Sequence, residues 1–304
     1  MKLRSELRLS DGVTSRASGQ DSNSIIESLL HDRLVELEAA VHADVLAYFG
    51  PIIDPAHDLL RNAIDDLENR ASRLAVVLET EGGFAESAER LQRLFRHNYQ
   101  VVDFIVPGYA MSAGTILAMS GDAISMDYSS VLGPIDPQVR RDEGNVSALG
   151  YIEKYDALIR KSARGELTTA ELAYLVQNFD PGDLSQYAHA RDLAIALLKD
   201  WLVRFKFKDW TVTRDRKIAV TPAMKTRRAE EIAKELNNTR RWHSHSRGIP
   251  MDVLIKDLNL QIDDFGADPK LDAAIRSYYV LLKDYMLRRG HQIVWHTRRG
   301  HNGV

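Results

Sequence analysis

Short apolar runs alternate with helix-spaced segments over the first third of the chain, and this alternation limits the fold more than any other feature. The apolar runs are residues 44–49 (DVLAYF), 74–78 (LAVVL) and 101–106 (VVDFIV). The segments between them, 57–70 and 84–96, carry apolar residues at helical spacing. Strands that alternate with helices of ten or more residues are typical of parallel βαβ units. Right-handed crossovers would stack these units with a helix layer on a face of the sheet.

The remainder of the chain reads as mostly helical. A helix is expected at 24–40, and after about Asn145 the expected helices are 147–163, 168–178, 185–206, 222–238, 250–258 and 268–289. Thr168 and Glu171 have the spacing of a capping box. The basic, glycine-punctuated stretch 288–304 predicts a mobile tail or a contact arm.

These patterns divide the chain into four parts. The expected parts are a flexible arm at 1–24, an α/β catalytic core at 25–145, a helical extension that completes the fold at 146–265, and a C-terminal helix with a basic tail at 266–304. The fold class predicted is therefore α/β, a parallel βαβ core with a mostly helical C-terminal half.

Composition excludes several classes of protein. The 304 residues include no cysteine, so disulfides, cysteine nucleophiles and thiolate metal sites are ruled out. No run approaches the roughly 18 apolar residues of a membrane helix, and the start lacks a secretory signal, so a soluble cytoplasmic protein is expected. Residues 201–304 carry 21 Lys and Arg against 12 Asp and Glu. Acids interrupt these basic residues and no binding motif accompanies them, which argues against nucleic acid.

Two turns after strands have the residues that acyl transfer needs. Gly82 and Gly83 end one strand and precede a helix, where backbone N–H groups can approach a substrate without side-chain obstruction. Ser112 follows the next strand, in the small-residue turn PGYAMSAGT (107–115). At a helix N-terminus, free N–H groups would stabilise developing negative charge beside it. Ordinary turn chemistry and close helix packing are the alternative explanations for the two segments.

Three stretches resemble the serine dehydrogenase proteinase family of the Clp/crotonase superfamily, which is related to signal peptide peptidase A and the Clp proteolytic subunit. They are LETEGGFAESAERL (78–91), VPGYAMSAGTILAMSGDAISMDYSSVLGPIDPQ (106–138) and, more weakly, RRWHSHSRGIPMDVLIKDLNL (240–260). Order and spacing match over about 35–260. The resemblance implies a Clp/crotonase-like core of spiral ββα units, a peptide or protein substrate, no cofactor and a homo-oligomer, either trimer-based or dimeric.

The resemblance assigns roles to individual residues. Ser112 matches the proposed nucleophile, and the N–H groups of Gly83 and Ala113 would hold the oxyanion while Gly82 shapes the turn. The loop beside the nucleophile would contain Pro134 and Asp136, together with Gly133, Pro137 and Gln138. The Clp proteolytic subunit would place its histidine where this chain has Pro134, which argues against a Clp-type Ser/His/Asp triad.

A lysine is the expected general base, as in relatives of signal peptide peptidase A that use a Ser/Lys dyad. In those relatives the lysine follows the serine by some forty to fifty residues, which fits Lys154 and, as the alternative, Lys161. The two share one face of a helical stretch. A lysine base requires burial that lowers its pKa, whereas most lysines are solvated surface residues.

His243 and His245 are a further possibility for the base. Two residues apart, they would share a face on a strand. They could equally be structural histidines at a segment junction. No Asp, Glu or His with ligand spacing accompanies them, so no metal site is predicted.

The function expected is that of a soluble serine hydrolase, an ATP-independent peptidase with a backbone oxyanion hole. The alternative is a non-catalytic or partner-gated oligomeric module of the same fold. An acyl-CoA enzyme of the crotonase type ranks below both, because it needs carboxylates near the oxyanion hole and does not need Ser112. No G-x-G-x-x-G stands in the sequence to bind a dinucleotide.

Overall fold

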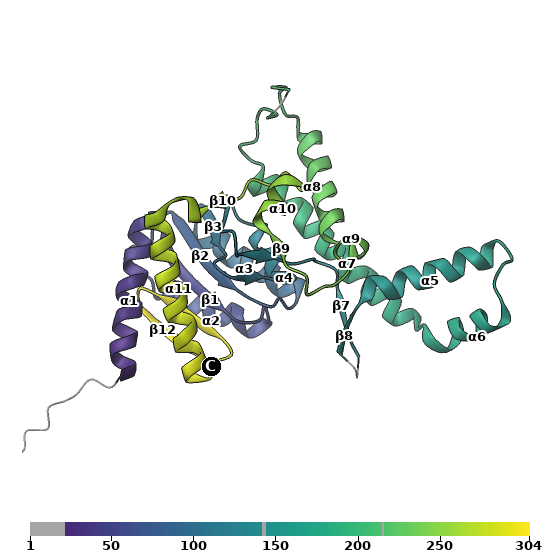
Figure 1. The fold of residues 1–304 in the computed structure, drawn as a ribbon, viewed down its shortest axis with the longest axis horizontal. Helices are drawn as coiled ribbons and strands as arrows, with labels where there is room; N and C mark the ends of the chain where they lie inside the picture. Colours follow the sequence, from purple (N-terminus) through teal and green to yellow (C-terminus); the bar gives the residue numbers. More distant parts are fainter. Residues whose placement is uncertain (1–21, 142–143, 215) are drawn as a thin grey trace, which may run out of the picture.

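The computed structural model describes residues 22–141, 144–214 and 216–304. Most of the arm expected at 1–24 therefore lies outside the described residues, and the described chain opens with helix α1 at Ser22. Figure 1 shows a sheet covered by helices on both faces, with a helical arm that projects from one side. Every helix among the described residues is too short or too polar to cross a lipid bilayer.

A seven-stranded, mainly parallel sheet forms the centre, in the order β10-β5-β3-β2-β1-β11-β12. Its parallel strands are β1 (Asp44–Phe49), β2 (Arg73–Glu79), β3 (Val101–Ile105), β5 (Ala123–Met126) and β10 (Asp263–Asp264). The three apolar runs predicted as strands are β1, β2 and β3. Strands buried on both faces are expected to read as continuous apolar runs, and every residue of β1 is buried. The predicted α/β class is confirmed.

The stretch 288–304, expected to be a mobile tail or a contact arm, makes contacts with the core. Its strand β11 (Val294–Thr297) pairs antiparallel with β1, and β12 (Gly300–Gly303) pairs with β11. All four residues of β11 are buried. Arg298 helps to hold this hairpin, because its guanidinium donates hydrogen bonds to the side chains of Asp44 and Glu38. Arg298 of the tail is thus a contact with the core.

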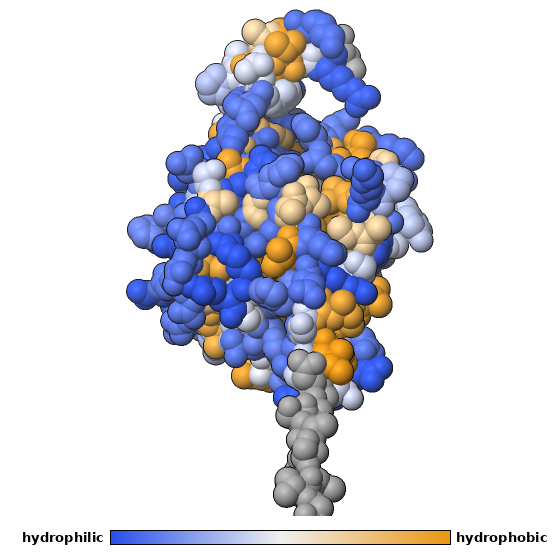
Figure 2. All heavy atoms as spheres, turned by 90° about the vertical axis from the view of Figure 1, so that its left-hand side faces the viewer, coloured by the Kyte–Doolittle hydropathy of each residue, from blue (hydrophilic) through white to orange (hydrophobic). Residues whose placement is uncertain are grey.

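Helices cover both faces of the sheet. On one face lie α1 (Ser22–Val41) and α11 (Pro269–Arg289), side by side in Figure 1. Their buried residues pack against Val45, Ala47 and Phe49 of β1. Figure 2 looks onto this side of the molecule, where hydrophilic side chains predominate and groups of apolar ones lie among them. This pair of helices therefore shields the sheet, while Ile25, Leu29, Val35, Val280 and Leu287 on its outer side are exposed.

The other face is covered by a larger group of helices around the main core. They are α2 (Asp54–Asp65), α3 (Ala85–Asn98), α4 (Ala113–Ala118), α7 (Pro181–Trp201) with the π-helix η1 (Leu202–Lys206), α8 (Pro222–Leu236) and α10 (Met251–Lys256). Leu46 and Tyr48 of β1 point to this side, alternating with the residues that face α1 and α11. The remaining short helices are α9 (Thr239–Trp242) and the 3-10 turn η2 (Phe265–Ala267).

The projecting arm consists of α5 (Ala148–Ala163) and α6 (Thr169–Asn178), which follow the hairpin β7 (Gln138–Arg141) and β8 (Gly144–Ser147). The capping box predicted at Thr168 and Glu171 is present at the start of α6. Phe179 lies among the rings of Tyr151, Tyr155 and Tyr174, at centroid distances of 4.6, 5.7 and 5.9 Å. The arm thus has a small aromatic core of its own.

A second, small sheet brings the candidate site together. It consists of β4 (Tyr109–Ala110), β6 (Val131–Leu132) and β9 (Ile249–Pro250), in that order. Strands β4 and β6 are parallel, and β9 is antiparallel to β6. The segments that follow β4 and β6, and the segment that precedes β9, therefore lie at the same end of this sheet.

Candidate active site

Ser112 sits in a strained turn between β4 and α4. Its backbone adopts φ 51° and ψ −117°, and its hydroxyl caps no helix N–H. A positive φ is uncommon for a residue with a side chain and persists only where neighbouring structure enforces it. Two hydrogen bonds do so, from the Met111 N–H to the Thr80 carbonyl (2.9 Å) and from the Gly114 N–H to the Met111 carbonyl (2.8 Å). The turn lifts Ser112 out of the strand at the start of a buried helix.

The Gly82–Gly83 turn lies directly against Ser112. A Cβ built on Gly82 would come within 2.7 Å of the Ser112 Cβ, and one on Gly83 within 2.1 Å of the Ile52 carbonyl oxygen. Both glycines have positive φ, 105° and 152°. Because L side chains rarely adopt these angles and neither site has room for a methyl group, the sequence needs glycine at both positions.

Two backbone N–H groups beside Ser112 have no acceptor within the described chain. The Ile52 segment pairs with the Gly82 carbonyl (2.7 Å) and with the Phe84 N–H (2.9 Å), which leaves the Gly83 N–H on the opposite side of the turn. Ala113 is the first residue of α4, where N–H groups lack an intrahelical partner. The predicted donors Gly83 and Ala113 thus have N–H groups available to a ligand oxygen.

The loop after β6 packs against the same turn. A Cβ on Gly133 would approach the Met111 Cα to 3.0 Å, and the Gly133 N–H donates to the Thr115 hydroxyl (2.9 Å). That hydroxyl in turn donates to the Ala110 carbonyl (2.7 Å), so it joins α4, β4 and this loop. Pro134 is buried in the loop, and Asp136 follows it with 1% of its surface exposed. The residues predicted beside the nucleophile are therefore placed at this end of the small sheet.

His245 meets Asp136 across this loop. Its Nδ1 lies 2.9 Å from Asp136 Oδ1, although the two residues are 109 positions apart in the chain. His243 differs: it is exposed, with φ 62° at the end of α9. The sequence offered both histidines as possible general bases. The structure distinguishes them, since of the two only His245 contacts a buried carboxylate.

One comparison with known proteins falls on the region that contains the Ser112 turn. Residues 45–162 match the model of the ClpP-like SDH-type serine proteinases, a stretch that contains the glycine pair, Ser112 and Asp136. Over this region the chain is similar to that family. The resemblance read from the sequence is confirmed here.

Two curated relatives come from Methanocaldococcus jannaschii, and both carry the name of an uncharacterized protein. MJ1495 is 27% identical over 191 residues, which is 62% of this chain and 51% of that protein. MJ0137 is 39% identical over 64 residues, or 21% of this chain and 22% of that protein. The chain thus spans about half the length of the first relative and about a fifth of the second.

Among solved structures, the 1510-N membrane-bound stomatin-specific protease, as a lysine-to-alanine mutant with a substrate peptide, has a TM-score of 0.43. It is 16% identical, and the match covers 72% of this chain and 73% of that one. The ClpP protease catalytic domain of Plasmodium falciparum has a TM-score of 0.28 at 13% identity, covering 33% of this chain and 57% of that one.

Neither predicted lysine contacts the Ser112 turn. Lys154 and Lys161 both lie on α5, in the arm that projects from the sheet in Figure 1. Lys154 is exposed. Lys161 donates to Glu171 Oε1 (2.6 Å), and this hydrogen bond lowers the pKa of Glu171 to about 2. Within one chain, the described geometry does not join either lysine to Ser112.

A buried polar cluster around Glu79, the residue before Thr80, was not predicted. Glu79 ends β2 with 6% of its surface exposed, and its carboxylate accepts from the Tyr279 hydroxyl and from Lys283 Nζ (2.8 Å), both on α11. Burial alone would lower the pKa of Lys283, but its hydrogen bonds to Glu79 and Tyr279 raise it. Lys283 is therefore held in its charged form and ties α11 to the strand that leads into the glycine pair.

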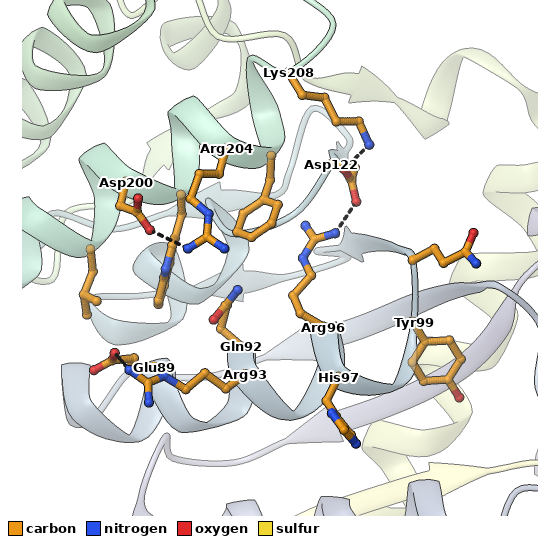
Figure 3. Close-up of a pocket in the computed structure, with 14 residues that line it drawn as sticks. Glu89, Gln92, Arg93, Arg96, His97, Tyr99, Asp122, Asp200, Arg204 and Lys208 are labelled. Carbon is orange, nitrogen blue, oxygen red and sulfur yellow. Dashed lines mark hydrogen bonds and ion pairs between the residues drawn. The ribbon is translucent and has the colours of Figure 1, made fainter.

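A groove of about 680 Å³ between α3 and the α7–η1 helix is a separate feature (Figure 3). Its charged side chains are already paired: Arg96 with Asp122 (2.6 Å), Arg204 with Asp200 (3.0 Å), and Lys208 also with Asp122. The lining residues include neither glycine of the turn nor Ser112. The groove is thus an ion-paired helix junction outside the candidate site. In the described part of the chain, no three His, Asp or Glu residues are grouped to hold a metal.

Proposed function

We propose that this chain is a serine peptidase in which Ser112 attacks a peptide carbonyl. The observation that carries the proposal is the strained Ser112 turn, held between the glycine pair and the first turn of α4. Nucleophiles are commonly presented on sharp strand-to-helix turns that expose the hydroxyl. The match of residues 45–162 to a serine proteinase family supports the same reading.

The oxyanion hole in this proposal is the pair of unpaired N–H groups of Gly83 and Ala113. Both flank the serine, and neither has an acceptor among the described residues. When the carbonyl carbon becomes tetrahedral, its oxygen gains negative charge that two such donors stabilise. Removing one donor of this kind typically raises the barrier by about 3–4 kcal/mol.

The predicted Ser/Lys dyad does not form within the described structure of one chain. Because α5 extends away from the sheet, Lys154 or Lys161 would have to reach Ser112 from a second copy of the chain or after α5 had moved. The homo-oligomer predicted from the resemblance, trimer-based or dimeric, is the setting in which such a dyad could form. Native mass measurement of wild type and of a Lys154→Ala variant, with labelling rates for each, tests it.

A fluorophosphonate probe tests the nucleophile directly. The probe forms a bond between its phosphorus and an activated serine oxygen, with loss of fluoride. Intact-mass analysis should find one adduct on the wild type and none on Ser112→Ala. Ser162→Ala, an exposed position on α5, is the matched control and should label as the wild type does. An adduct that survives in Ser112→Ala would contradict the proposal.

Cleavage of a peptide library, read by mass spectrometry, separates the remaining functions. A peptidase should cut peptides and lose most turnover in Ser112→Ala. An acyl-CoA enzyme should keep its activity in that variant, since its chemistry does not use the serine. A non-catalytic or gated module should neither cut peptides nor take up the probe while it remains folded.

A further inference from the structure

Three segments that are remote in the sequence meet at one end of the small sheet. Ser112 is two residues beyond β4, Asp136 is four residues beyond β6, and His245 is four residues before β9. Since β4 and β6 are parallel and β9 runs against β6, all three residues leave the sheet at the same end. Neighbouring strands lie about 4.8 Å apart, so the serine, the carboxylate and the imidazole leave the sheet from three adjacent strands, with β6 between β4 and β9.

Asp136 and His245 form a couple with a defined orientation. Asp136 is buried, and its carboxylate also accepts from Gln138 Nε2 (2.9 Å), so the group is fixed in place. The Nδ1 of His245 faces this carboxylate, and the imidazole side chain is 20% exposed. A carboxylate at Nδ1 favours the tautomer with hydrogen on that nitrogen, which makes Nε2 a proton acceptor.

The Nε2 atom of His245 is free for this task, because no other group among the described residues hydrogen-bonds the ring. His245 thus uses one ring nitrogen within the fold and keeps the other without a protein partner among the described residues. An imidazole that a carboxylate orients at one nitrogen can accept a proton at the other, as a general base does.

We propose that His245 is the general base for Ser112 and that Asp136 positions it, an inference that rests on the proposed peptidase function. His245 Nε2 takes the Ser112 hydroxyl proton as Oγ bonds to the peptide carbon, and the carbonyl π pair moves to the oxygen held by Gly83 and Ala113. The imidazolium gives that proton to the leaving nitrogen as the C–N bond breaks. Water then attacks the ester, His245 takes its proton, and Ser112 regains a proton as the acid leaves.

His243 provides a matched control for the histidine. It is two residues away, exposed, and without a carboxylate partner in the part of the chain that the structure describes, so a change there alters the segment without altering the couple. The experiment measures the rate of fluorophosphonate adduct formation, by intact mass, on the full chain. The variants are His245→Gln, His245→Ala, His243→Gln and Asp136→Asn, with Ser112→Ala as the blank.

The expected result is a fall of about 10²-fold or more in the Ser112-dependent rate for both His245 variants, the typical contribution of a general base. His243→Gln should label at the wild-type rate. Gln at 245 can still donate to Asp136 but cannot take a proton, so it separates loss of the base from loss of the contact. Free imidazole should restore part of the rate in His245→Ala. It should not restore Asp136→Asn, in which the misoriented ring still fills the site.

Labelling at the wild-type rate in His245→Gln and His245→Ala would overturn the inference while leaving Ser112 as the nucleophile. A fall in Lys154→Ala instead would give the role to the lysine. Absence of any Ser112-dependent adduct on the wild type would contradict the proposed function itself. If circular dichroism shows that His245→Ala is unfolded, the test rests on His245→Gln. A His245→Gln protein that is folded and labels at the wild-type rate would overturn the inference.

Discussion

Gly82 lies beneath Ser112 with no space between them for a methyl group, since a Cβ at Gly82 would come within 2.7 Å of the serine Cβ. Gly82→Ala should therefore displace Ser112, the proposed nucleophile, before it unfolds the protein. We expect fluorophosphonate labelling to fall at least about 10²-fold, as misplacement by an ångström can cause. Thermal unfolding should show a smaller loss, about 1–3 kcal/mol for an alanine forced to positive φ.

Gly150→Ala is the control for this glycine. Gly150 lies in α5 with open space around its Cβ position. In a helix interior, alanine is favoured over glycine by about 1 kcal/mol, so this variant should keep its reactivity and gain slightly in stability. Equal labelling of Gly82→Ala and Gly150→Ala would show that the close contact does not hold the serine in place.

Lys283→Met should destabilise the protein by removing the cation that pairs with buried Glu79. Lys283 is partly exposed, so we expect a loss of about 1–3 kcal/mol, below the value for a fully buried pair. The pKa of Lys283 is raised in the folded state. Its contribution to the free energy of unfolding is therefore fully present at a pH below the ordinary lysine pKa, and it is lost as the pH rises from that pKa through the raised one. Urea unfolding at pH 7 and above pH 10.5 measures this.

Lys270→Met, an exposed change on the same helix, serves as the comparison and should leave the urea midpoint within error. A Lys283→Met midpoint equal to that of Lys270→Met would mean that the Glu79 contact does not anchor α11.

His296 should make the fold sensitive to acid. It is 1% exposed in β11, beside the Tyr278 hydroxyl, and burial lowers its pKa to about 3. The unfolded chain takes up this proton near pH 6.5, so between the two values it binds more protons than the folded state. Stability therefore falls with falling pH in this window, by up to about 1.4 kcal/mol per pH unit.

The measurement for His296 is the unfolding free energy of wild type and His296→Gln between pH 7 and 5, where most carboxylates stay ionised. The glutamine can keep a hydrogen bond to Tyr278 and does not titrate. Its curve should be flatter than that of the wild type, and parallel curves would assign the acid sensitivity to other groups.

Phe179→Ala should loosen the projecting arm and leave the core unchanged. The ring sits among three tyrosines of α5 and α6, and its loss should cost about 1–3 kcal/mol locally for a partly buried aromatic. Hydrogen exchange should increase over α5 and α6 only, whereas Val176→Ala, 71% exposed, should change nothing. If Ser112 of Phe179→Ala is labelled at the wild-type rate although the arm is loosened, that result would count against a lysine of α5 as the general base.

The large elements could be predicted because their signals are local. The buried strands β1, β2 and β3 are apolar runs, and the helices on both sides carry helical spacing. The sequence could not decide between a mobile tail and a contact arm, because the burial of the tail depends on β1, almost a whole chain away, and Arg298 pairs with Asp44 and Glu38 there.

The candidate site also has parts that could be predicted from the sequence and parts that could not. The two turns that contain Ser112 and the glycine pair could be predicted, since in each the end of a strand and the start of a helix lie close together in the sequence. The pairing of His245 with Asp136 could not, because β4, β6 and β9 are two residues long and leave no periodic signal. A contact made through such short strands is visible only when the whole chain has folded around them.

The pairing of β11 with β1 has a consequence for how the protein is made. Strand β1 is synthesised near the start of the described chain, whereas the strand that covers its outer edge is made after every helix. On the ribosome, β1 can pair with β2 as soon as both emerge, but its other edge offers unpaired backbone groups throughout the rest of translation. The nascent chain therefore carries an open β-edge, a binding site for chaperones or for another nascent chain, until residues 294–297 close it.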